Sequence, residues 1–303
     1  MYNGILCFHK PQNFTSHDVV AKLRGMLRQK RIGHAGTLDP MATGVLVVLL
    51  GTATRASDDA TGHSKTYLAG LRPGTVTDTQ DIWGHVVSTN SADISAADVE
   101  AVLPQFRGEI EQIPPMVSAV QIGGQRLYKL ARQGIEVDRP ARNVTISGLR
   151  LVPDAAVSER DFALEITCSK GTYVRTLCHD IGALLGCGGC LSALTRTVSG
   201  PFRLADALTF EDIEKLHRAG TLEGRLLPVD AVYADFPAIT LNENGANRVV
   251  HGNYLDSRHI SAGTPPPEGA RCRVYLPDGN FYMVGITRPD GTVACHKTFF
   301  AKE

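Results

Sequence analysis

Long hydrophobic segments are absent from this sequence of 303 residues. No window holds the roughly 18 apolar residues that a helix needs to cross a bilayer. The first residues lack the positively charged start and the cleavage site of a secretory signal. We therefore expect a soluble, cytoplasmic protein with no membrane partner.

Signatures of cofactor and metal binding are also missing. The sequence has no complete phosphate-binding loop and no dinucleotide fingerprint. Its seven cysteines form an odd, scattered set that does not fit a small disulfide-bonded framework. Cys187 and Cys190 have the spacing of half a zinc site, but no second such pair is present to complete four ligands. The sequence predicts reduced cysteines, no metal and no cofactor.

The sequence has no excess of positive charge, because 31 Lys and Arg residues balance 31 Asp and Glu residues. Nucleic-acid-binding proteins usually carry such an excess. The charges are unevenly distributed, however: residues 22–31 hold five bases and no acid, and residues 126–142 hold five bases and two acids. These two segments can dock phosphates on a neutral protein, although each alone is also typical of a solvated face. The balancing acids lie in residues 73–106, which contain no base: Asp78, Asp81, Asp93, Asp98 and Glu100.

The length and the strand signals indicate two domains. A chain of 303 residues exceeds the size that one hydrophobic core usually supports. Alternating runs at 271–276, 280–287 and 292–299 are separated by Pro-Asp-Gly turns, which indicates a small antiparallel β meander. We therefore expect a first domain over 1–234 and a β-rich C-terminal domain over 235–303. Seven acids balance seven bases after position 234, so a purely structural C-terminal cap is an alternative to a nucleic-acid-binding domain.

The first domain has the pattern of an α+β fold. Alternating or continuous apolar runs predict strands at 4–8, 45–50, 65–70 and 162–168. A helix is predicted after Ser16, because four apolar residues recur at helical spacing: Val19, Leu23, Met26 and Leu27. We expect Ser16 to cap this helix. A second helix is predicted to end at Gly186 and to bury the stripe Leu177, Ile181, Leu184 and Leu185.

Asp39 is the strongest candidate for a catalytic residue. It lies in a glycine-rich loop directly before the apolar run 45–50, and Pro40 disfavours helical dihedrals for it. Such a loop can hold a carboxylate in a cleft. Arg175 lies at the start of the second predicted helix, where a cation opposes the helix dipole, so a negative group is expected beside it. Asp39 is the candidate, and an arginine at contact distance would keep its carboxylate ionised.

The residues around Asp39 also carry a family resemblance. Residues 33–44 read G-H-A-G-T-L-D-P-M-A-T-G and precede V-L-V-V-L-L. This segment resembles the catalytic motif G-H-T-G-T-L-D-P-x-A-T-G-V-L of the bacterial TruB family of tRNA pseudouridine synthases, from which only Ala35 differs. The resemblance continues through K-P-Q-N-F-T-S-H-D-V-V at 10–20, through 114–134, through S-K-G-T-Y-V-R at 169–175 and through 191–202.

Three positions depart from the usual family pattern. Asn13 replaces a glycine, which is a mild change because asparagine also tolerates left-handed dihedrals. Val117 stands where an aromatic residue is common, and Gln121 where lysine is common. The change at Gln121 removes a possible phosphate contact from the segment 114–134, which in the family leads into an RNA-gripping loop.

The resemblance implies a fold and an activity. The fold is a pseudouridine synthase catalytic domain with a mixed, mostly antiparallel sheet, followed by a small PUA-like RNA-binding domain. The activity is the isomerisation of uridine 55 in the T-loop of tRNA, without a cofactor, a metal or an obligate protein partner, by a monomer. The target base must leave its stack to reach the protein.

The resemblance also implies roles for individual residues. Asp39 is catalytic, Arg175 pairs with it, and Tyr173 lines the same pocket. Tyr67 stacks on the target base, and Leu194 forms an apolar wall. Two further residues, Lys10 and His34, are expected to bind substrate. We expect His34 to lie in the same loop as Asp39 and to fill the gap that the flipped base leaves in the RNA stack.

Several alternatives remain open at this point. Asp39 could attack the sugar C1′ or the ring C6, or take a proton from C2′. A second alternative is a non-catalytic RNA-binding protein on the same scaffold, but such a protein would gain nothing from a buried charged pair. A third is a glycoside or nucleoside hydrolase. Most such enzymes need two acids at the scissile bond, whereas only Asp39 lies in a motif.

Overall fold

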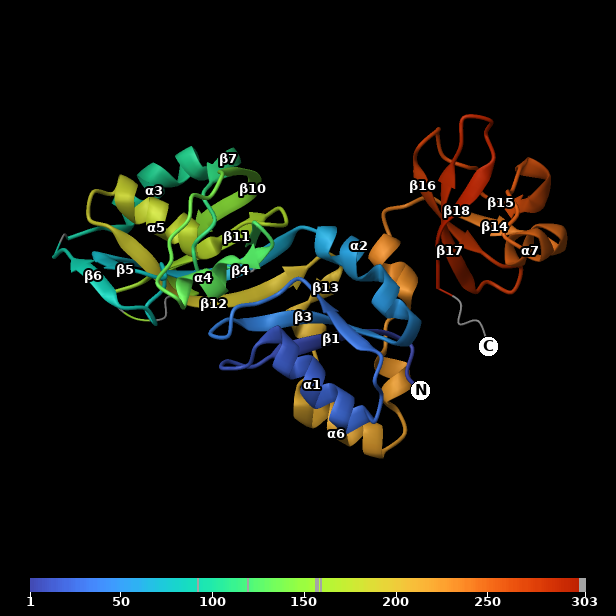
Figure 1. Ribbon diagram of the computed structural model, residues 1–303, viewed down its shortest axis with the longest axis horizontal. Coiled ribbons are helices and arrows are strands. Elements are labelled where there is room, and N and C mark those ends of the chain that lie inside the picture. The colour runs from blue at the N-terminus through green and yellow to red at the C-terminus, as the bar shows by residue number, and fades with distance from the viewer. Residues whose placement is uncertain (92, 119, 156–157, 159, 300–303) are drawn as a thin grey trace.

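The chain forms a large α/β lobe and a small β-rich lobe (Figure 1). We describe a computed structural model that covers residues 1–91, 93–118, 120–155, 158 and 160–299. Ala119, within the segment 114–134, lies outside the described residues. Among the helices in the described part, none is long and apolar enough to span a membrane.

A nine-stranded sheet forms the large lobe. Its central order is β1-β3-β12-β4-β11-β10-β7, while β2 also pairs with β3 and β13 with β12. Only the β3–β12 pair is parallel, which confirms the expected mixed, mostly antiparallel sheet. The strands are β1 Gly4–Lys10, β2 Ile32–Ala35, β3 Thr43–Leu50, β4 Lys65–Pro73, β7 Gly108–Gln112, β10 Arg142–Leu151, β11 Phe162–Cys168, β12 Gly189–Ser199 and β13 Phe202–Arg203.

Strand β3 is buried on both faces. Leu46, Val48 and Leu50 pack on one face with residues of α1 (Ser16–Leu27) and α6 (Phe210–Arg218). The opposite face carries Val45 and Val47, which pack with residues of the segment 53–60 and with Tyr233. This double coverage explains why 45–50 reads as a continuous apolar run, as is usual for a strand without a solvent-facing side.

Helix α1 is capped by Thr15, which corrects the expectation for Ser16. The Thr15 hydroxyl accepts a hydrogen bond from the Asp18 amide at 3.0 Å, and the Asp18 carboxylate accepts one from the Thr15 amide at 2.9 Å. This reciprocal pair satisfies two backbone donors that the helix leaves free. Ser16 is thereby available for another contact, and it is buried against the Asp39 loop.

Helix α5 (Val174–Leu184) covers the other end of the sheet. Leu177 and Ile181 are fully buried in a core that includes residues of β4, β10 and β11. Leu184, predicted to be buried in the same stripe, is 45% exposed, whereas Leu185 packs against this core. The buried stripe therefore lacks one of its four predicted members.

Short elements fill the rest of the large lobe. Two small hairpins project from the sheet: β5 Thr75–Thr77 with β6 Val86–Thr89, and β8 Gln121–Ile122 with β9 Gln125–Arg126. The remaining helices are α2 Ser57–Gly62, α3 Ala96–Val102 and α4 Leu127–Ala131.

The C-terminal lobe confirms the predicted meander and adds to it. Strands β16 Arg271–Tyr275, β17 Phe281–Thr287 and β18 Val293–Thr298 pair antiparallel in order. β14 (Ala238–Leu241) joins β16 in parallel, β15 (Ile260–Ala262) pairs with β14, and α7 (Glu243–Val250) follows β14. The short strands β14 and β15 were not predicted from the sequence.

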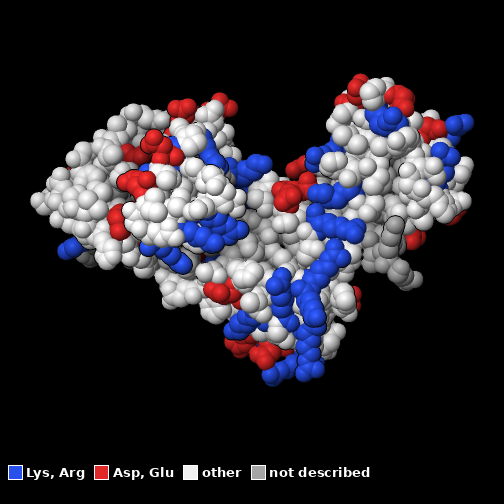
Figure 2. Space-filling view, in the orientation of Figure 1, with Lys and Arg blue, Asp and Glu red and all other residues white. Residues whose placement is uncertain are grey.

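Basic side chains gather in a stripe that runs up the face shown in Figure 2 towards the C-terminal lobe. The five basic residues of segment 22–31 are all exposed. Most of the basic residues of segment 126–142 are exposed as well, on the lobe that carries α4. The balanced net charge therefore coexists with locally basic surfaces.

Gly44 provides a test of this architecture. It has φ 99°, and a Cβ there would lie 2.2 Å from the Arg196 carbonyl oxygen of the parallel partner β12. We expect Gly44→Ala to lower the free energy of unfolding by about 3 kcal/mol, the upper end for a strained residue. Gly33→Ala is the matched control, because a Cβ there meets only Thr54 Cγ2 at 3.7 Å. Equal urea midpoints for the two variants would contradict this account.

Candidate active site

The Asp39 loop joins β2 to β3 and is held on both sides of Asp39. Before it, the Leu38 amide donates to Ser16 Oγ at 2.9 Å, and Ser16 Oγ donates back to the Leu38 carbonyl at 3.3 Å. After it, the Asn13 amide donates to the Pro40 carbonyl at 2.9 Å. The segment around α1 therefore fixes the loop, and the Asp39 side chain remains 38% exposed.

Lys10 occupies a structural position behind this loop. The sequence predicts that Lys10 binds substrate, but its side chain is fully buried at the end of β1. Its ammonium group donates to the carbonyl oxygens of Pro11, Phe14 and Pro40 at 2.9, 2.6 and 3.1 Å. Burial lowers the pKa of Lys10 to about 8. The structure thus corrects the prediction, because Lys10 holds the backbone of the loop and does not line the cavity.

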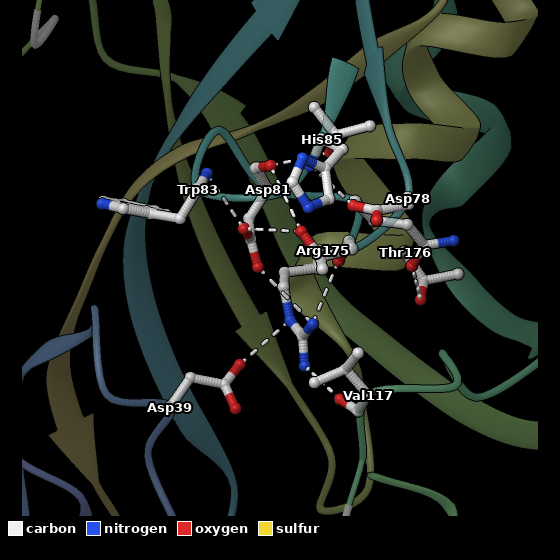
Figure 3. Close-up of polar contacts among 11 residues, drawn as sticks. Asp39, Asp78, Asp81, Trp83, His85, Val117, Arg175 and Thr176 are labelled. Carbon is white, nitrogen blue, oxygen red and sulfur yellow. Dashed lines mark hydrogen bonds and ion pairs between the residues drawn. The ribbon is translucent and has the colours of Figure 1, made fainter. Parts of the chain in front are cut away.

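Arg175 forms an ion pair with Asp39. The distance from Arg175 Nε to Asp39 Oδ2 is 3.0 Å, and the guanidinium side chain is only 4% exposed (Figure 3). Arg175 Nη1 donates to the Thr79 carbonyl at 3.0 Å and Nη2 to the Val117 carbonyl at 2.8 Å. The arginine therefore contacts three separate segments at once, each through a different nitrogen of its planar guanidinium.

Asp81 is a second carboxylate on Arg175 that the sequence analysis counted only among the balancing acids. Its Oδ2 lies 3.5 Å from Arg175 Nη1, and its side chain is 7% exposed. Its Oδ1 accepts from Thr79 Oγ1 at 2.8 Å and from the Trp83 amide at 3.1 Å. Burial raises the pKa of Asp81, although Thr79 and Arg175 both favour its ionised form. The clustering of Asp78, Asp81 and Gly84 between two strands was the only sequence signal for this contact.

A cavity of about 350 Å³ opens beside the Asp39–Arg175 pair. This volume lies at the lower end of the range for small-molecule sites and suits one nucleoside-sized ligand. Five of the seven predicted site residues line it: Asp39, Tyr67, Tyr173, Arg175 and Leu194. The structure thus brings together residues from one loop, two strands and the start of one helix.

Tyr67 and Leu194 provide the apolar part of the cavity. They lie on the neighbouring strands β4 and β12, and their side chains are almost fully buried. Burial raises the pKa of Tyr67, and the nearby charge of Arg196 opposes this shift. The phenol is therefore neutral.

Tyr173 caps the edge of the cavity at the start of α5. Gln112 of β7 fixes the Tyr173 backbone through two hydrogen bonds. The Tyr173 amide donates to Gln112 Oε1 at 3.0 Å, and Gln112 Nε2 donates to the Tyr173 carbonyl at 3.3 Å. Burial raises the pKa of its phenol. Tyr173 is therefore fixed through its backbone, with a neutral phenol beside the cavity.

Two buried cations that the sequence analysis did not assign to the site also line the cavity. Arg196 donates to the carbonyls of Val45 and Gly36 at 2.7 and 2.8 Å. Lys65 donates to the carbonyls of Thr61 and His63, and burial lowers its pKa to about 8. A basic residue inside an apolar strand pattern is the signal that could have identified Arg196, because buried charges require partners.

His34 lies in strand β2, which corrects the expectation that it shares the loop of Asp39. It pairs with Val48 of β3, and it does not line the cavity. Its Nδ1 is buried without a hydrogen-bond partner among the described residues, and burial lowers the pKa of its imidazole. His34 is therefore a neutral ring at the edge of the sheet, next in sequence to the loop.

The cysteines of the chain are free thiols. Six of them are buried, including Cys187 and Cys190, and Cys295 is exposed. Within the described residues, no group of three or more His, Cys, Asp or Glu side chains could hold a metal ion.

Solved structures with the same fold are known. A chain in a structure described as a Cbf5-Nop10-Gar1 complex matches 99% of this chain and 85% of its own, with a TM-score of 0.77 and 24% identity. A second, from an H/ACA RNP bound to a substrate RNA containing 2′-deoxyuridine, has a TM-score of 0.76, 22% identity and coverage of 99% and 86%. These likenesses establish the fold.

Family models and curated relatives establish the class. Residues 24–174 match the TruB family pseudouridylate synthase (N terminal domain), and residues 175–233 match the tRNA pseudouridylate synthase B C-terminal domain. A tRNA pseudouridine synthase B from Heliobacterium modesticaldum is 49% identical over 86% of this chain and 85% of its own. One from Pseudomonas putida is 40% identical over 96% of this chain and 94% of its own.

The sheet, the cavity and these matches define a pseudouridylate synthase. Within that class, the chain belongs to the TruB family.

Replacement of Arg175 by lysine tests the geometry of the site. An ammonium group cannot reach Asp39, Thr79 and Val117 together, so Asp39 would lose its fixed position. We expect Arg175→Lys to lower the single-turnover rate of pseudouridine formation about 100-fold, the cost of misplacing a reacting group. Arg72→Lys is the control, because Arg72 of β4 pairs with the buried Asp161 outside the cavity. Equal rates for the two variants would show that the fork geometry of Arg175 is dispensable.

Proposed function

We propose that this protein isomerises uridine 55 in the T-loop of tRNA, with Asp39 as the catalytic residue. The observation that carries the proposal is a partly exposed carboxylate, 3.0 Å from a buried guanidinium, on the wall of a nucleoside-sized cavity. The curated relatives named tRNA pseudouridine synthase B support tRNA as the substrate. The resemblance of residues 33–44 to the family motif supports the T-loop uridine as the target.

The reaction needs one ionised carboxylate and no external reagent. The N1–C1′ bond breaks, the uracil turns, a C5–C1′ bond forms, and the C5 proton is lost while N1 gains a proton. Asp39 attacks C1′ or C6, or removes the C2′ proton, and each of these roles requires the anionic form. Arg175 pairs with this carboxylate and orients one of its oxygens.

The walls of the cavity fit an extruded base. Tyr67 presents an aromatic ring on which uracil can stack, a contact worth about 1–3 kcal/mol per base. Leu194 and Tyr173 bound the remaining space. His34, outside the cavity, would fill the gap in the RNA stack, and its lowered pKa favours the neutral ring that enters such a stack most easily.

The surface of the molecule supports binding of a folded RNA. The exposed basic segments 22–31 and 126–142 supply cations on the surface of the catalytic lobe. We propose residues 235–303 as a PUA-like RNA-binding domain. We further propose that the protein acts in the cytoplasm as a monomer.

The position of Asp81 weighs against the hydrolase alternative. A glycosidase of the usual kind places two carboxylates at the scissile bond. Asp81 is turned towards Arg175 and does not line the cavity, so a single carboxylate, Asp39, faces the substrate space in the described part of the chain.

Replacement of Asp39 by asparagine tests the proposed function. The amide keeps the shape of the side chain but lacks its charge, so we expect the rate to fall by about 10⁴-fold or more. The measurement is incubation with unmodified tRNA transcript, followed by mapping of pseudouridine from carbodiimide-dependent primer-extension stops. A transcript with cytidine at position 55 should give no stop. Activity that survives in Asp39→Asn, modification at another uridine, or release of free uracil would each contradict the proposal.

A further inference from the structure

Helix α2 lies between the C-terminal lobe and the catalytic loop. The Asp59 carboxylate of this helix contacts three donor side chains that lie outside the large sheet. Oδ2 accepts from Lys297 Nζ of β18 at 2.5 Å and from Tyr233 Oη at 2.8 Å, and Oδ1 lies 3.3 Å from Arg271 Nη1 of β16. Burial opposes ionisation of Asp59, but Lys297 and Tyr233 outweigh it and lower its pKa. This charged contact therefore docks the C-terminal lobe on α2.

The other side of the same helix holds the backbone around the active site. Ser57 Oγ donates to the His34 carbonyl at 3.1 Å, and the Gly36 amide donates to Thr61 Oγ1 at 3.2 Å. Thr61 lines the cavity, and its carbonyl accepts from Lys65 at 2.6 Å. The helix spans only Ser57–Gly62, so a shift at Asp59 moves both of these hydroxyl contacts.

The contact between the lobes is also apolar and continuous with the core of the large sheet. Tyr233 lies within 6.1 Å of Phe281 and 5.7 Å of Phe299, measured between ring centroids. The same cluster contains Ala60 of α2 and Ala35 of β2. Residues of the C-terminal lobe thus pack in the same apolar cluster as Ala35, the residue directly before the catalytic loop.

We propose that Asp59 is a positioning residue through which the docked C-terminal lobe sets the catalytic loop, so that this lobe contributes to the rate of the chemical step as well as to RNA binding. The inference rests on the proposed function. Loss of the Asp59 charge frees α2 from Lys297 and Arg271, which loosens the hydrogen bond from Gly36, three residues before Asp39. Asp59 itself does not line the cavity.

The first test is Asp59→Asn, with Asp58→Asn as the matched control. Asp58 is the exposed neighbour on the same helix. We expect Asp59→Asn to lower the single-turnover rate at saturating enzyme about tenfold, a cost expected for small misplacement of a reacting group. The affinity for tRNA transcript, measured by filter binding, should stay close to that of the unaltered protein. Asp58→Asn should leave both quantities unchanged.

The second test separates this coupling from a simple loss of folding. Lys297→Met removes one donor from the C-terminal lobe and should reproduce the slower step. The double variant Asp59→Asn/Lys297→Met should be no slower than Asp59→Asn alone, because both changes break one interaction. Hydrogen exchange of the Gly36 amide should be about tenfold faster in both single variants than in Asp58→Asn, as for a locally loosened segment.

The outcomes distinguish the inference from the proposed function. Equal single-turnover rates for Asp59→Asn and Asp58→Asn, or a loss confined to RNA affinity, would overturn the inference. Unchanged exchange at Gly36 would overturn it as well, and this readout does not depend on activity. A lack of pseudouridine formation by the unaltered protein would instead overturn the proposed function.

Discussion

The guanidinium of Arg175 is the contact on which the catalytic site depends. It meets Asp39 at 3.0 Å, the buried Asp81 at 3.5 Å, and the backbone carbonyls of Thr79 and Val117. Removing a charge from water is costly unless partners are fixed around it, and here the four partners come from three different parts of the fold. The loop, the segment before β6 and the segment before β8 are therefore held together by one side chain.

Backbone carbonyls compensate the remaining buried cations. Lys10, Lys65 and Arg196 are all less than a tenth exposed, and each donates to carbonyl oxygens next to the catalytic loop. These contacts satisfy carbonyls of the irregular backbone, and Lys65 and Arg196 add two basic side chains to the cavity wall that also carries Asp39. Among the described residues, no metal ligand set accompanies them.

The two lobes pack against each other directly. Nine strands of the large lobe form one sheet with covering helices, and β14 to β18 form a second sheet. Aromatic rings from both segments nevertheless pack into a common cluster, and Asp59 adds a charged contact at its edge. Large apolar contacts of this kind restrict relative domain motion, which is why the smaller lobe can influence the geometry of the larger one.

Local patterns in the sequence determined the strands 45–50 and 162–168, the C-terminal meander and, through a motif, the cavity residues Asp39, Tyr67 and Arg175. Period and turn chemistry are local properties, so the sequence carries them directly. Only the tertiary structure decided that Asp81 is buried against Arg175, that Lys10 braces the loop, that His34 belongs to a strand, and that Leu184 is exposed. Whether a charged or apolar side chain is buried depends on segments distant in sequence, and no local pattern encodes which segments will cover it.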